Sequence, residues 1–209
     1  MPSSLLSSQQ AADEIRARTG FKAHTRWIRT LCGAGLLTNR STNQRVRIDP
    51  TELEMLLIRH PRRVLGFEYL GVSLLPVDAN SPAFHRDPPW PLYRTHAGYD
   101  HHNTHGLTPD QRARAITSIW RISDDLAQDV VDRGMPLIGS VGGLVTPQMI
   151  YWPRAVVTLQ GGVGFDVDPD RTGHLDIPSG ALIDVKPGNT WRIERAPAAA
   201  HYRTPSTSR

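Results

Sequence analysis

The spacing of apolar residues over the first 60 positions limits the possible folds of this chain more than any other feature. Ser7 and Gln10 have the spacing of a helix capping box, in which each side chain bonds the other residue's backbone amide. The apolar residues that follow are spaced to form one short buried face: Ala11, Ala12 and Ile15. Gly20 ends this helix, because glycine takes the left-handed conformation without strain. The sequence therefore predicts a short capped helix.

The next helical pattern, HTRWIRTLCGAGLL, has an apolar side and a basic side. Its three- and four-residue spacings predict one buried stripe, made of His24, Trp27, Ile28 and Leu31. The other side carries Lys22, Thr25, Arg26 and Arg29. A helix, a tight turn and a second helix with a basic outer face have the geometry that fits a DNA major groove. We therefore expect these polar residues to contact DNA.

Beyond the second helix the apolar pattern changes to the two-residue period of a strand. Two short extended runs flank a polar turn of Ser, Thr, Asn and Gln. Val46 and Ile48 point to one side of the second run, and two arginines point to the other. This pattern predicts a β-hairpin with an arginine edge. We expect it to extend the DNA-contacting surface with Arg40, Arg45 and Arg47.

A third helix is predicted immediately after the hairpin. Asp49 is its cap, Pro50 lies in its first turn, and Glu52 closes a capping box. Its predicted buried face consists of Leu53, Leu56 and Leu57. The helix is expected to end before Pro61, because proline disfavours helical geometry in the residue that precedes it.

The basic residues of the chain are concentrated in its first third. Residues 1–65 contain eleven Lys or Arg and five Asp or Glu, a net charge of +6, whereas the formal net charge of the whole chain is +4. The remaining residues therefore carry a net charge of −2. A basic N-terminal third joined to a near-neutral remainder favours a polyanionic partner for the N-terminal third alone.

The order of these parts resembles the winged helix-turn-helix of the MerR and excisionase-like DNA-binding families. The matching stretches are SSQQAADEI for the first helix, TRWIRTLCGAGLL for the recognition helix, NQRVRID for the wing and PTELEMLL for the closing helix. The resemblance covers about residues 4–60. It implies that the second helix enters the major groove and that the wing contacts the backbone or the minor groove. It also implies a transcriptional regulator or a recombination directionality factor.

The remaining two thirds predict a second domain, so the expected fold class is α+β. VLGFEYLGVSLLPV predicts one or two strands, and the proline-rich stretch at 78–106 favours an irregular loop. LTPDQRARAITSIWRISDDLAQDVVDRG has helical spacing and predicts a long helix, or two helices, capped by Thr108 and Gln111. Short runs after Pro136, bounded by Gly, Pro, Asp and Asn, have the profile of an antiparallel sheet. The expected domains are 1–62, winged helix-turn-helix; 63–196, α+β; and 197–209, a disordered tail.

The stretch HAGYDHHNTHG holds four of the nine histidines of the chain. A catalytic zinc ion takes three protein ligands, and Asp100 could complete a set. Against this reading, no predicted helix holds these residues at a fixed spacing, since the nearest one begins after them. Two interpretations stay open. One is a polar loop whose histidines cap the following helix or bond the backbone, and the other is a zinc site made of His96, His102 and His105.

The single cysteine, Cys32, excludes an internal disulfide framework and is expected to pack as a small apolar side chain. No segment approaches the roughly 18 continuous apolar residues of a membrane span. The first ten residues also lack the charged-then-apolar order of a secretory signal. We therefore expect a cytoplasmic protein that makes no membrane contact.

These observations favour a sequence-specific double-stranded DNA-binding protein that is not an enzyme, needs no cofactor and forms a homodimer. Two alternatives from other classes remain. One is a metal-dependent, nuclease-like enzyme that uses the histidine segment and is delivered to DNA by the N-terminal module. The other is an adaptor whose arginine face meets an acidic partner.

Overall fold

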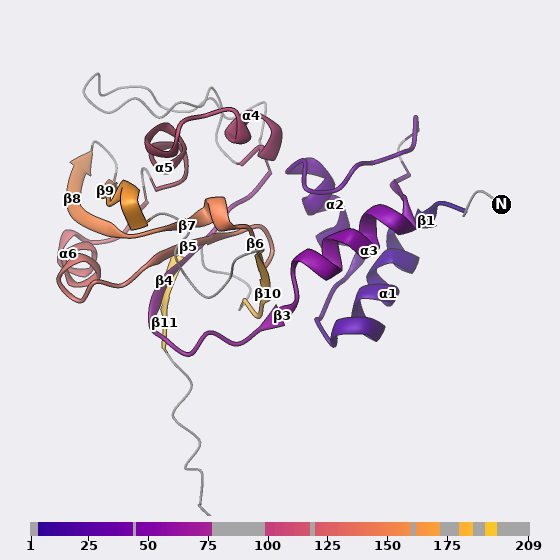
Figure 1. Ribbon diagram of the computed structural model, residues 1–209, viewed down its shortest axis with the longest axis horizontal. Coiled ribbons are helices and arrows are strands. Elements are labelled where there is room, and N and C mark those ends of the chain that lie inside the picture. Colours follow the sequence, from indigo (N-terminus) through magenta and orange to yellow (C-terminus); the bar gives the residue numbers. More distant parts are fainter. Residues whose placement is uncertain are drawn as a thin grey trace, which may run out of the picture.

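The computed structural model describes residues 4–43, 45–76, 99–117, 120–159, 162–171, 180–185 and 191–195. It has helices and several sheets, which confirms the predicted α+β class. Figure 1 shows the N-terminal helices gathered at one end of the molecule and the larger sheets at the other. Most of the predicted proline-rich loop at 78–106 and all of the predicted tail at 197–209 lie outside the described residues.

The N-terminal end consists of helices and one short strand pair. Its elements are β1 (Leu6–Ser7), α1 (Ser8–Thr19), α2 (Thr25–Gly33), β2 (Arg47–Ile48) and α3 (Pro50–Arg59). The predicted capping box of α1 is confirmed, since the Ser7 hydroxyl accepts a hydrogen bond from the Gln10 amide and the Gln10 side chain accepts one from the Ser7 amide. Gly20 follows α1 with φ 66°, which confirms the predicted left-handed end.

Most of the predicted buried stripe of α2 is present: Trp27, Ile28 and Leu31 are buried. The prediction was wrong for His24, which is exposed and caps the helix. Its ring Nδ1 accepts a hydrogen bond from the Trp27 amide at 3.2 Å. A histidine directly before a helix can satisfy a free amide, so its helical spacing did not require burial.

The segment at 38–46 is a loop held by hydrogen bonds and not the predicted two-stranded hairpin. β2 pairs antiparallel with β1, while Arg40 N donates to Arg47 O at 2.8 Å across the loop. Asn39 Oδ1 accepts from the Arg47 amide at 3.0 Å, and Asn43 Oδ1 accepts from the Arg45 amide at 2.9 Å. These side chains take the backbone amides that a hairpin ladder would use, which is why the regular pairing stops here.

Helix α3 begins and ends as predicted, with one difference. Asp49 accepts a hydrogen bond from the Thr51 amide at 2.8 Å, and the leucine face is buried. Glu52 does not close the predicted capping box, because its Oε1 accepts from the Thr38 amide at 2.7 Å. This carboxylate therefore ties α3 to the segment that follows α2.

The part of the molecule that follows α3 is called the body here. Its described strands form two sheets and a hairpin. The four-stranded sheet runs in the order β11 (Trp191–Glu194), β4 (Tyr69–Ser73), β5 (Leu137–Ser140) and β7 (Ile150–Tyr151). The three-stranded sheet runs in the order β3 (Arg62–Arg63), β10 (Ala181–Ile183) and β6 (Leu144–Val145). The hairpin consists of β8 (Pro153–Leu159) and β9 (Gly162–Val167).

The strands after Pro136 pair antiparallel with one another, as predicted: β10 with β6, β5 with β7 and β8 with β9. Two further pairs, each with a strand from before Pro136, were not predicted. β4 pairs parallel with β5, and β3 pairs parallel with β10. Parallel neighbours need a long connection, and in both cases the chain between the two strands is long enough to supply it. The sequence pattern of each strand is local, so it contained no information on which distant strand would be its neighbour.

The connection between β4 and β5 contains α4 (His101–His105), α5 (Pro109–Thr117) and α6 (Asp124–Asp132). For the stretch after residue 107 we expected a long helix or two helices, and the structure has two, α5 and α6. They are interrupted at Trp120, whose amide and carbonyl both bond Val163 of β9, at 2.8 and 2.9 Å. The predicted cap of α5 is confirmed by reciprocal bonds between Thr108 and Gln111. No helix within the described ranges is long and apolar enough to cross a membrane.

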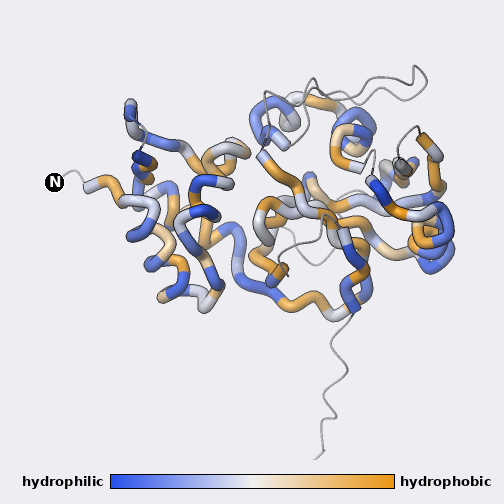
Figure 2. Tube along the Cα trace, turned by 180° about the vertical axis from the view of Figure 1, so that it is seen from behind, coloured by the Kyte–Doolittle hydropathy of each residue, from blue (hydrophilic) through white to orange (hydrophobic). Residues whose placement is uncertain are grey.

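The two ends of the molecule share one hydrophobic core. Trp27 of α2 reaches the turn between β5 and β6, where its Nε1 donates a hydrogen bond to Gly142 O at 2.6 Å. Phe21 packs against the same indole, with 5.4 Å between the ring centroids. Figure 2 shows hydrophobic strands through the middle of the body and hydrophilic stretches on the outer helices. The predicted boundary at residue 62 falls inside β3, a strand of the body.

His60, directly after α3, also lies where the N-terminal end meets the body. It is buried, its Nδ1 lies 2.8 Å from Leu56 O, and its ring packs against Gly180. Burial lowers the pKa of this imidazole below its ordinary value of 6.5, and the nearby Arg59 charge adds to the effect, although the hydrogen bond to Leu56 opposes it.

We expect Gly142→Ala to destabilise the protein at the Trp27 contact. Gly142 has φ +60°, and an added Cβ would lie 2.6 Å from the indole. The left-handed conformation should cost about 1–2 kcal/mol in an alanine, and displacing the packed ring about 1–3 kcal/mol more, measured by urea unfolding. Gly134→Ala is the matched control, because Gly134 also has φ +60° but would have no atom within 4 Å of its Cβ. Equal losses in the two variants would contradict the packing role of Trp27.

We expect His60 to make stability depend on pH. Because its folded pKa is lowered, the unfolded chain binds the proton more readily than the folded chain. The stability contributed by neutral His60 should be complete above about pH 6.5 and should fall as the pH decreases through the window below 6.5. His60→Gln should flatten this part of the profile of unfolding free energy against pH. A profile with the wild-type slope would refute the assignment to His60.

Candidate nucleic-acid interface

The basic side of α2 faces solvent. Arg26 and Arg29 are exposed, as is Lys22 just before the helix, and Thr25 in the first turn is partly exposed. In the part of the chain that the structure describes, none of the three basic side chains forms an ion pair. Their charged groups are therefore free to bind an external anion.

The arginines of α1 are arranged differently, because α1 and α3 also carry acids. Arg16 pairs with Asp13 on the same helix. Arg18 lies 3.7 Å from Glu14 and 3.5 Å from Glu54 of α3. The sequence of α2 contains no Asp or Glu, so its guanidinium groups have no such partner within their own helix.

The loop at 38–46 carries the other predicted DNA-contacting residues. Arg45 is exposed and Arg47 is partly exposed, and neither forms an ion pair with a described residue. Arg40 is exposed and lies 3.8 Å from Glu52 Oε2. At this distance and exposure the pair contributes little to stability, so another anion can replace the carboxylate.

The body covers the C-terminal end of α2. A Cβ added at Gly33 would lie 3.1 Å from Pro76, and one added at Gly35 would lie 2.8 Å from the His102 ring. The His101 amide also donates a hydrogen bond to Ala34 O at 2.9 Å. A polyanion therefore has access to the N-terminal half of the helix, which is the half that contacts base edges in helix-turn-helix proteins.

The expectation that no helix holds the histidine segment was wrong, because α4 contains His101, His102 and His105. Asp100 caps it, accepting hydrogen bonds from the His102 amide at 2.9 Å and the Asn103 amide at 3.2 Å. His96 and the side chain of His105 lie outside the described residues. Within the described ranges, no group of three His, Cys, Asp or Glu side chains could hold a metal ion. The zinc site at these histidines stays a prediction.

A polar cluster beneath α4 was not predicted from the sequence. The hydroxyl of the buried Tyr99 lies 3.1 Å from His101 Nδ1, and Arg112 donates to two backbone carbonyls of this segment at 2.9 and 3.3 Å. Burial raises the pKa of Tyr99 to about 12, although the Thr146 hydroxyl and Arg112 favour the phenolate. The neutral phenol therefore contacts the first residue of α4. These hydrogen bonds join residues two to eight positions apart in the chain. The sequence did not reveal the cluster, because we expected an irregular loop up to residue 106 and a loop fixes no spacing between side chains.

Cys32, on the partly buried side of α2, has a protonated thiol at neutral pH. Burial and, to a lesser extent, the negative charge of Glu52 raise its pKa to about 11. The thiol packs against the core as the sequence predicted, and a thiol in this state is a poor nucleophile.

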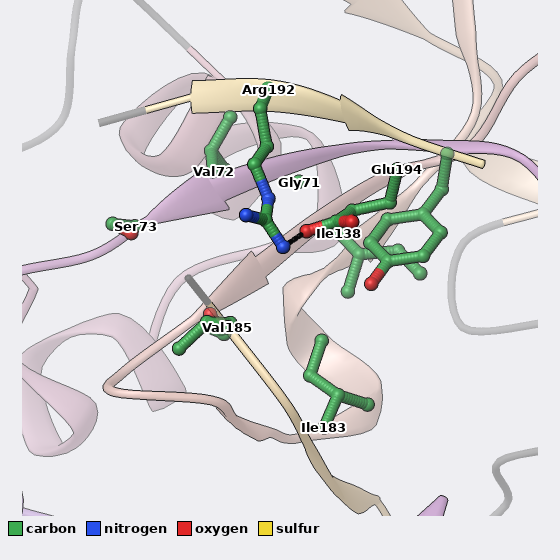
Figure 3. A pocket seen from close by; sticks show the side chains of 10 residues that line it. Gly71, Val72, Ser73, Ile138, Ile183, Val185, Arg192 and Glu194 are labelled. Carbon is green, nitrogen blue, oxygen red and sulfur yellow. Dashed lines mark ion pairs between the residues drawn. The ribbon is translucent and has the colours of Figure 1, made fainter. Parts of the chain in front are cut away.

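The body also contains a small hollow between the four-stranded sheet and β10. Figure 3 shows Arg192 and Glu194 paired at this hollow, with Ile183 and Val185 across from them. Its volume is about 20 Å³, which is room for about one water molecule. This hollow is a packing feature, and it is too small for an organic ligand.

We expect Glu52→Ala to loosen the loop at 38–46, because Glu52 binds the Thr38 amide and lies near Arg40. The variant should lose about 1 kcal/mol of unfolding free energy, and the Thr38 amide should exchange its hydrogen about fivefold faster. Glu54→Ala on the same helix is the control, since its exposed pair with Arg18 contributes about 0.5 kcal/mol or less. Wild-type exchange at Thr38 in the first variant would show that Glu52 does not brace the loop.

Comparisons of the chain with models of known protein families, with curated proteins and with solved structures found no match. The resemblance to the MerR and excisionase-like families therefore stays a prediction, and the functional argument rests on the side chains described above.

Proposed function

We propose that the protein binds double-stranded DNA with its N-terminal end, α2 lying in the major groove and the loop at 38–46 against the neighbouring backbone. The observation that carries the proposal is that Arg26 and Arg29 are exposed on α2 and form no ion pair with a carboxylate of the described residues. A guanidinium group suits both tasks of such an interface, because it binds phosphate and also pairs bidentately with guanine.

Two features support the winged helix-turn-helix interpretation. Residues 20–24 join α1 to α2, and α2 offers its N-terminal half, where recognition helices contact base edges. The loop follows α2 directly and adds the exposed Arg45 and the partly exposed Arg47. In this proposal the loop takes the part of the wing.

A transcriptional regulator or a recombination directionality factor is the role that we propose for such a module. Both roles need recognition of DNA and no chemistry on it. Dimerisation would double the contact area and is expected for a symmetric target site. The homodimer and the zinc ion stay predictions from the sequence.

The proposal is tested by reversing the charge of α2. In a mobility-shift assay with a pool of random duplexes, titrated with salt, Arg26→Glu combined with Arg29→Glu should weaken binding at least about 100-fold. Replacing the same two residues by alanine should reduce the slope of log affinity against log salt by up to about 2, since each lost phosphate contact removes about 0.9.

The matched control is Arg121→Glu with Arg195→Glu, which changes the net charge equally at two exposed arginines of the body. This control should keep wild-type affinity. If both double variants weaken binding to the same extent, net charge alone acts and α2 is not the interface. A wild-type protein that retains no duplex from the pool at low salt would refute the proposed function itself.

A further inference from the structure

An open groove of about 360 Å³ lies between the ends of α1 and α3. It is lined by Arg18, Thr19, Leu57, Ile58, Pro61 and Arg62. These residues come from the last turns of the two helices and from the start of β3. None of the predicted DNA-contacting residues lines the groove, so it is a second surface of the N-terminal end.

The fold leaves one apolar side chain of the groove in solvent, Ile58, and another on the same helix, Met55. Ile58 is 62% exposed, and Met55, one turn earlier on α3, is 42% exposed. Residues three apart lie on the same face of a helix, so these two side chains form one patch. The hydroxyl of Thr19 donates to Ile15 O at 2.7 Å and is thus already satisfied within the fold. Neighbouring exposed apolar side chains next to a groove are typical of protein contact sites.

Two arginines border this patch, and contacts within the protein hold both in position. Arg62 donates from Nη1 to Gly20 O at 3.2 Å, and its Nη2 lies 2.6 Å from Asp184. Arg18 lies 3.5 Å from Glu54 and 3.7 Å from Glu14. A guanidinium group has five N–H donors, so each arginine keeps donors for a further acceptor.

Because Arg18 and Arg62 have acidic partners, the uncompensated positive charge near the groove comes from two other arginines. Arg59 and Arg63 flank the lining residues in the chain, and both are exposed. Neither forms an ion pair with any residue in the described ranges. An exposed apolar side chain with arginines next to it in the chain is complementary to an apolar side chain flanked by carboxylates.

We propose that this groove binds an acidic segment of another protein, which packs an apolar side chain on Ile58 and directs carboxylates to Arg18, Arg59, Arg62 and Arg63. Duplex DNA would satisfy the arginines but would leave Ile58 and Met55 without an apolar partner. The C-terminal residues 196–209 of the chain itself include Arg203 and Arg209 and no acid, so their charge does not complement the groove. The inference is independent of the proposed DNA binding.

The test is a selection from a random library of displayed 16-residue peptides against the full-length protein. The selected peptides should contain an apolar residue next to two or more Asp or Glu. Synthetic copies should bind at least tenfold more weakly to Ile58→Asp and to Arg59→Glu with Arg63→Glu. Val64→Asp is the matched control, because Val64 is 76% exposed and does not line the groove. Far-UV circular dichroism and the melting temperature check that each variant is folded, and Ile58→Ala, expected to bind more weakly as well, replaces Ile58→Asp if that variant is not.

Four results would overturn the proposal. They are an absence of enriched peptides, enriched peptides without acidic residues, binding that Ile58→Asp leaves unchanged, and equal weakening by Val64→Asp. If Ile58→Asp changed the sedimentation of the protein, the groove would bind a second copy of the chain instead of another protein. If Ile58→Asp lowered the affinity for duplex DNA, the groove would bind DNA. Wild-type duplex binding in Ile58→Asp together with lost peptide binding supports the proposal. Failure of duplex binding in the wild-type protein bears on the DNA-binding proposal alone.

Discussion

The remaining arrangement depends on one hydrogen bond, which the Trp27 indole donates to the carbonyl of Gly142. This bond lies inside the core that both ends of the molecule share. It joins residues that are 115 positions apart in the chain. Because it directs the apolar side of α2 inward, the opposite side, with Arg26 and Arg29, is left to solvent. The body therefore sets which face of α2 an external ligand can reach, and its contacts at Gly33 and Gly35 set which half.

The carboxylates decide what that free face can bind. Acids on α1 and α3 partner the arginines of α1 and, weakly, Arg40. The sequence of α2 carries none, so its positive charge is not compensated within the helix. Exposed ion pairs contribute little to stability, which means that their distribution matters here for recognition more than for folding. The same reasoning separates α2 from the groove between α1 and α3, where the arginines border exposed apolar side chains.

Predictions that depended on neighbouring residues were mostly confirmed. The capping box at Ser7, the left-handed Gly20 and the reciprocal cap of α5 all follow from bonds within a few residues. Several outcomes depended on a distant partner and were not predicted. Glu52 binds the amide of Thr38 from another segment, and two strand pairs are parallel because their partners lie far along the chain. At the candidate interface, sequence could name the arginines but not their lack of ion pairs.

The sequence by itself determined where α1 and α3 begin and end, which of their faces are apolar, and that positive charge is concentrated in the first third, since these are properties of local spacing and composition. Only the tertiary structure decided which strands are neighbours, which arginines remain unpaired and which end of α2 the body covers. Those outcomes depend on contacts between residues that the chain brings together only when the common core closes, and a one-dimensional pattern carries no distance between such residues.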